Sequence, residues 1–103
     1  MFLILITFLF SPASYAYVNF GSGIGSCGSW IEARETEESN PKRAFQQTWF
    51  EGYLTGYGAA TNATYKQNDV WAMFIWIDNY CRENPLEKLA IAAHALVKEL
   101  TDQ

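Results

Sequence analysis

The stretch WAMFIWIDNYCRENPLEKL, from Trp71 to Leu89, decides the fold. Apolar residues recur in and just before it every three or four positions, on more than one side of a helix. They form three stripes, which are Val70, Phe74, Ile77 and Cys81; Met73, Trp76 and Tyr80; and Trp71 with Ile75. A helix that is apolar on nearly every side is a buried one. We therefore expect this helix to be central, with the other elements packed around it.

Start and stop signals flank this helix. Asn68 and Asp69 offer side-chain oxygens to the first amides, and Asp69 adds a negative charge at the positive end of the helix dipole. Pro85 ends the helix. The segment Asn-Pro-Leu-Glu around this proline predicts the cap of a last helix, from Pro85 to about Thr101, with Leu86 on its apolar face.

The composition favours one small exported domain. The chain has 103 residues, of which 50% are hydrophobic and 17% aromatic, enough for a packed core. Its start, MFLILITFLF, is too short to span a bilayer and is followed by a Ser-Pro break and by Ala16, which predicts a signal peptide over residues 1–16. A retained N-terminal anchor is the alternative. Residues 17–26 are predicted to be a flexible lead-in, and residues 27–103 an all-α four-helix domain.

The formal net charge of -4 argues against nucleic acid as a partner. Binding to a polyanion requires clustered Lys and Arg, whereas here seven scattered basic residues face 11 acidic ones. The acidity either keeps a small domain dissolved or suits a cationic protein surface.

Cys27 and Cys81 are the two cysteines of the chain. An even count in an exported protein predicts one disulfide, here between the start of the first helix and the end of the central one. Closing a loop of this length stabilises the fold by about 4 kcal/mol in the chain-entropy model. A redox pair or a metal site is disfavoured, because no CxxC spacing and no neighbouring histidine accompany the cysteines.

Two helices precede the central one. Ser29 and Glu32 form a capping box for a first helix from Trp30 to about Glu37. An Asn-Pro cap predicts a second helix, Pro41 to about Ala60. Two neighbouring apolar stripes are expected on it, one of Phe45, Trp49, Gly52, Gly56 and Ala59 and one of Phe50, Leu54 and Tyr57. The two glycines are expected in close contact with the central helix, because glycine costs about 1 kcal/mol in a helix interior.

Two polar segments are candidate contact surfaces for a protein partner. The acidic run contains Glu35, Glu37 and Glu38, and is otherwise a solvated helix end. The polar connection, Thr61 to Gln67, contributes Asn62, Thr64, Tyr65 and Lys66. Its Asn-Ala-Thr also matches the N-glycosylation sequon, which matters only in a eukaryotic secretory host.

No catalytic, cofactor or metal site is predicted. His94 is the one histidine, so a nucleophilic triad or a zinc site lacks its other members; we expect a partly buried structural histidine, or a pH sensor. Asp78 and Glu51 could serve acid–base chemistry, but Asp78 is better explained by an ion pair with Arg82, four residues on. Glycines at 23, 25 and 28 match GxGxxG without the strand and helix that give the motif meaning.

Three segments carry a family resemblance. These are Cys27-Gly28-Ser29-Trp30, the helix Trp49-Phe50-Glu51-Gly52-Tyr53-Leu54-Thr55-Gly56-Tyr57, and the junction Tyr80-Cys81-Arg82-Glu83-Asn84-Pro85. Together they resemble small exported all-helical proteins of the Tai-type immunity family and of the HdeA-like type.

The Tai-type resemblance implies a periplasmic protein without enzymatic activity or cofactor, which blocks a peptidoglycan-cutting amidase delivered by a type VI secretion system. A protruding loop would plug the cleft of the amidase, and Thr61 to Asn68 or Glu35 to Glu38 would be that plug. The HdeA resemblance implies instead a dimeric chaperone that separates in acid and binds unfolded clients. A homodimer is thus left open, and a small enzyme that uses Asp78, Glu51 or His94 is the third alternative.

Overall fold

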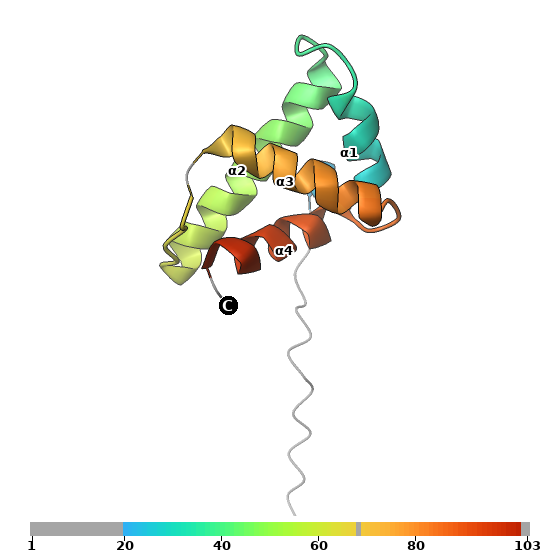
Figure 1. Cartoon of the computed structure of the whole chain (residues 1–103). Helices are drawn as coiled ribbons and strands as arrows, with labels where there is room; N and C mark the ends of the chain where they lie inside the picture. Colours follow the sequence, from blue (N-terminus) through green and yellow to red (C-terminus); the bar gives the residue numbers. More distant parts are fainter. Residues whose placement is uncertain (1–19, 68, 102–103) are drawn as a thin grey trace, which may run out of the picture.

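The computed structural model describes residues 20–67 and 69–101. Over these residues the chain is all-helical and forms a compact four-helix domain with one Cys27–Cys81 disulfide, as predicted (Figure 1). The elements are η1, Gly21–Ile24; α1, Cys27–Arg34; α2, Pro41–Thr61; α3, Val70–Glu83; and α4, Leu89–Thr101. The predicted signal peptide lies outside the described residues. Among the helices that are described, none is long and apolar enough to cross a membrane.

An aromatic cluster from three helices forms the centre of the core. Trp30 of α1 lies with its ring centroid 5.9 Å from Phe50 of α2 and 5.8 Å from Phe74 of α3. The face of α4 fills the remaining space with buried small and branched side chains, which are Leu89, Ala92, Ala93, Leu96, Val97 and Leu100. The domain is therefore built around contacts between residues distant in sequence.

The central helix α3 is buried along one of its three predicted stripes and partly buried along a second. Phe74, Ile77 and Cys81 are in the core, as expected. The third stripe is not buried, because Trp71 and Ile75 are 57% and 56% exposed. α1 and α4 are the main neighbours of α3 (Figure 1), so one side of α3 remains open to solvent.

The second helix begins as predicted and buries the stripe of Phe50 and Leu54, not that of the two glycines. The side chain of Asn40 accepts a hydrogen bond from the Lys42 amide at 2.9 Å, and Pro41 is the first helical residue. The buried residues of α2 are Gln46, Phe50 and Leu54. The face with Phe50 and Leu54 is the one that packs on the core, because burying Phe and Leu removes far more apolar area from water than burying Gly does.

The predicted close approach at Gly52 and Gly56 is wrong. A Cβ added at either glycine would meet no atom within 4 Å, and Phe45 at the start of the same stripe is 69% exposed. The face of α2 that contains both glycines is therefore open to solvent.

Residues 20–26 of the predicted lead-in form a packed turn that contains η1, whereas residues 17–19 lie outside the described residues. Gly23 is buried so closely under the Trp49 indole that an added Cβ would overlap it. Trp49 Nε1 donates a hydrogen bond to the Phe20 carbonyl at 2.9 Å. α1 then begins earlier than predicted, because Ser26, whose side chain accepts from the Ser29 amide at 3.1 Å, is its N-cap. It also ends earlier, at Arg34.

The last helix begins at Leu89 and not at Pro85. The residues between Glu83 and Leu89 form a loop, so Leu86 is not part of the apolar face of α4. This loop is part of the candidate surface described below.

Candidate protein-binding surface

The acidic run lies at the turn between α1 and α2. Glu35, Glu37 and Glu38 are all exposed there. Arg43 of α2 stabilises the turn, because its guanidinium donates hydrogen bonds to the carbonyl oxygens of Arg34 and Thr36 at 3.3 and 2.7 Å. The three carboxylates thus stand on a well-supported turn.

The polar connection after α2 is tied to the domain by Tyr65. Its phenol donates a hydrogen bond to the Leu54 carbonyl at 2.6 Å, and burial raises the pKa of this phenol above 10.0, with the neighbouring Tyr57 adding to the shift. Asn62 turns the chain in the left-handed conformation, at φ 57°. Asn62, Thr64 and Lys66 are exposed, whereas Tyr65 is half-buried and structural.

The structure does not bring these two candidate surfaces together. They lie at opposite ends of α2 (Figure 1), a helix of 21 residues. At 1.5 Å per residue that helix separates them by about 30 Å, roughly the diameter of a small domain. A single cleft cannot take both segments as one plug.

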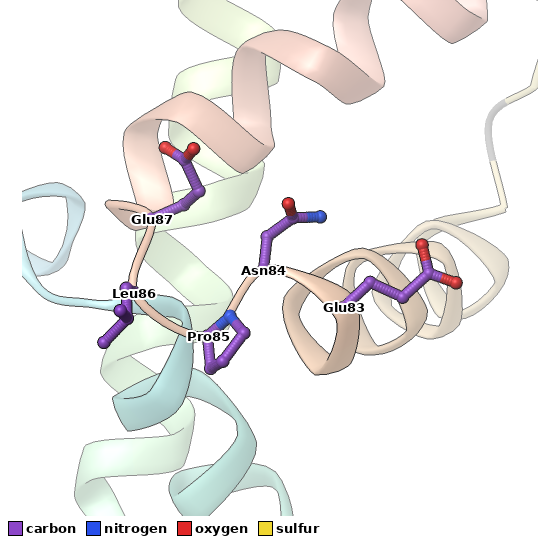
Figure 2. A pocket seen from close by; sticks show the side chains of 5 residues that line it. All are labelled: Glu83, Asn84, Pro85, Leu86 and Glu87. Carbon is purple, nitrogen blue, oxygen red and sulfur yellow. The ribbon is translucent and has the colours of Figure 1, made fainter.

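A third surface is formed by residues 84–88, which we name the Leu86 loop. Leu86 lies at its tip and is 95% exposed, the highest value of any large hydrophobic residue described. Residues 83–87 line a shallow hollow of about 360 Å³. Figure 2 shows the side chains of Leu86 and Glu87 pointing to different sides of the loop.

The backbone of the Leu86 loop is fixed despite this exposure. The Glu87 amide donates to the Asn84 carbonyl at 3.1 Å and closes a four-residue turn. We name residues 25–28 the strap. Further hydrogen bonds tie the loop and its ends to the strap and to α3. They are Asn84 Nδ2 to Tyr80 O, 3.0 Å; Cys27 N to Glu87 O, 2.7 Å; Gly28 N to Pro85 O, 2.9 Å; and Leu89 N to Gly25 O, 2.8 Å.

The strap itself is anchored to α3 by the disulfide. Cys27 and Cys81 are fully buried, with their Cα atoms 4.7 Å apart. Because Cys81 lies in the last turn of α3, the bridge sits directly beside the point where the Leu86 loop begins.

A buried ion pair fixes the other end of α1. Arg34 donates to both carboxylate oxygens of Asp78 at 2.9 Å, and Trp30 Nε1 donates to the same carboxylate at 2.7 Å. The predicted pair of Asp78 with Arg82 is therefore wrong, since Arg82 points outward and donates to Asn79 at 3.1 Å. Helix spacing alone favoured Arg82, but an arginine from another helix reaches the buried carboxylate.

The other titratable candidates do not converge on one place. Glu51 is exposed on α2, while Asp78 is buried in its ion pair. His94 is half-buried, with its ring centroid 6.2 Å from that of Tyr57. Over the described residues, no group of three or more His, Cys, Asp or Glu is placed to hold a metal ion.

The Leu86 loop is not predicted from the sequence, because Asn-Pro-Leu-Glu fits the start of a helix. The same four residues also fit a β-turn, with Asn first and Pro second. The strap, distant in sequence, decides between the two, because its amides bind the carbonyl oxygens of Pro85 and Glu87. Local sequence carries no signal for such a pairing.

Comparison with known proteins gives no relative for this chain: no family model, curated protein or solved structure matches it.

Proposed function

We propose that this chain is an exported protein-binding domain that acts as an immunity-type inhibitor of a cell-wall amidase. The observation that carries the proposal is the Leu86 loop, in which a fixed backbone presents an almost fully exposed leucine. The free energy falls when a partner covers a large apolar side chain that is otherwise exposed to water.

Rigidity makes such a loop effective in binding. A flexible loop loses conformational freedom when it docks, and this loss subtracts from affinity. The Leu86 loop is already ordered by its own turn and by the bonds to the strap. Leu86 would enter an apolar pocket of the partner, while Glu87, which points to another side of the loop, would face a basic group beside that pocket.

Two further observations support an exported binding protein. The buried disulfide is typical of proteins that fold in an oxidising compartment. The N-terminal sequence, outside the described residues, has the pattern of a signal peptide. In this proposal the Leu86 loop replaces the acidic run and the polar connection as the principal contact.

An acid-activated chaperone is the second candidate. Trp71 and Ile75 lie one turn apart on α3, and both are more than half exposed. An exposed apolar pair of this kind would serve for binding the apolar segments of unfolded clients.

Capture from a periplasmic extract at pH 7 and at pH 2.5, with mass spectrometry of the bound proteins, separates these functions. We expect the wild-type chain to retain one dominant cell-wall hydrolase at pH 7, and Leu86→Arg to lose it. Ile75→Arg is the matched control, because it places the same charge at another exposed apolar position and should still bind. Many unrelated proteins retained only at pH 2.5, and lost in Ile75→Arg, would establish the chaperone instead.

A further inference from the structure

We infer that formation of the Cys27–Cys81 disulfide assembles the Leu86 loop, so that the chain becomes competent to bind its partner only after oxidation. The consequence for binding rests on the proposed function, whereas the effect on the loop can be measured without any partner.

The position of Cys27 within the strap supports this inference. Its own amide binds the Glu87 carbonyl, and the amide of the next residue, Gly28, binds the Pro85 carbonyl. Two of the bonds that fix the loop therefore start from the residues whose place the disulfide sets. On the α3 side, the carbonyl oxygen of Cys81 accepts a hydrogen bond at 3.2 Å from the amide of Asn84, the first residue of the loop.

The rest of the domain is held together by other means. Trp30 is buried against Phe50 and Phe74, and the Arg34–Asp78 pair joins the far end of α1 to α3. α2 and α4 contain no cysteine. Loss of the disulfide should consequently loosen the strap and the Leu86 loop before it loosens the core.

The chemistry is an ordinary oxidation of two thiols. The two S–H bonds break and one S–S bond forms; two electrons and two protons pass to a disulfide oxidant, such as oxidised glutathione, which becomes two thiols. Both sulfur-bearing residues are fully buried once the domain is folded. The disulfide therefore forms during folding, and its burial afterwards protects it from reduction.

Amide hydrogen exchange followed by NMR tests the inference, with the oxidised full domain compared with Cys27→Ala/Cys81→Ala. We expect the amides of residues 27, 28 and 89 to exchange at least about tenfold faster in the variant, as local opening predicts. Amides within α2 and α4, such as those of Phe50 and Val97, exchange through global unfolding and record the overall loss of stability, so in the variant they should remain better protected than the strap amides. Leu86→Ala, which keeps the disulfide, is the matched control and should leave all these amides protected.

Both variants are made in a Gly52→Ala/Gly56→Ala background, where better helix propensity on an open face favours the folded state. Unchanged exchange at the strap would overturn the inference, and so would an equal loss of protection at every amide or a variant that does not fold. Faster exchange at the strap with unimpaired partner binding would uphold the disulfide's effect on the loop, and would show that the Leu86 loop is not the contact surface.

Discussion

The ion pair between Arg34 and Asp78 gives the sharpest prediction about stability. Asp78 is 7% exposed, and its carboxylate accepts three hydrogen bonds, two from Arg34 and one from Trp30. Asp78→Ala removes all three and leaves the guanidinium of Arg34 between aromatic rings, 5.8 Å from the centroid of Trp30 and 5.6 Å from that of Phe74. We expect this change to destabilise the domain strongly.

The size of the effect follows from the burial of the two side chains. Removing one partner of a buried ion pair costs about 3–5 kcal/mol, because the other charge stays buried without its partner. Here the Arg34 and Asp78 side chains are 15% and 10% exposed, so water can partly reach the remaining charge. We therefore expect about 3 kcal/mol for Asp78→Ala, at the lower end of that range.

Thermal and urea unfolding of the oxidised domain measure this loss. About 3 kcal/mol corresponds to a decrease in Tm of roughly 12–24 °C for a domain of this size. Asp78→Leu combined with Arg34→Met should recover part of the stability, since it removes both charges and keeps the volume but leaves the buried Trp30 Nε1–H without an acceptor. Arg82→Ala is the control, because that arginine is exposed and its loss should cost less than about 0.5 kcal/mol.

Two results would refute this reasoning. A loss below about 1 kcal/mol for Asp78→Ala would mean that the pair behaves like a solvated surface pair. A larger loss for Arg82→Ala than for Asp78→Ala would mean that the helix-spaced pair expected from the sequence is the one that matters.

Further predictions concern the glycines and Tyr65. Gly52→Ala and Gly56→Ala should each stabilise the domain by about 1 kcal/mol in urea unfolding, because nothing occupies the space of a Cβ there. Gly23→Ala should destabilise the domain, because the added Cβ would overlap the Trp49 indole. An equal change in unfolding free energy at all three positions would contradict the observed packing. Tyr65→Phe should cost about 1 kcal/mol at neutral pH through the lost hydrogen bond. Because the pKa of Tyr65 is raised above 10.0 in the folded state, its unfolded form loses the proton first, so the native domain loses stability as pH rises above about 10. This additional loss should be absent in Tyr65→Phe, and an identical pH dependence in both proteins would contradict the assignment.

Much of the fold could be predicted from local patterns. The period of the apolar residues indicated α2, α3 and α4, and Asn40 with Pro41 located the start of α2 to the residue. The disulfide was predicted from the even count of cysteines together with the expectation that the chain is exported. These features depend on neighbouring residues or on composition, which a single sequence contains.

The errors concern contacts between distant segments. Local spacing could not show that Arg34 reaches Asp78, that Phe50 faces the core in place of Gly52, or that the strap holds residues 84–88 as a loop. The exposed stripe of α3 was missed for a related reason, since the pattern measures how apolar a helix is and not how many neighbours cover it. The candidate contact surface changed accordingly, from two separate polar segments to the Leu86 loop.

Site-specific photo-crosslinking directly tests the proposal that the Leu86 loop is the contact surface. A photoreactive amino acid replaces Leu86, Glu37 or Thr64 in turn, which samples the three exposed surfaces in the same disulfide-bonded domain. After irradiation in a periplasmic extract at pH 7, we expect a strong crosslink to one cell-wall hydrolase from position 86 and little from positions 37 and 64. A crosslink from position 37 or 64 with none from position 86 would contradict the proposal.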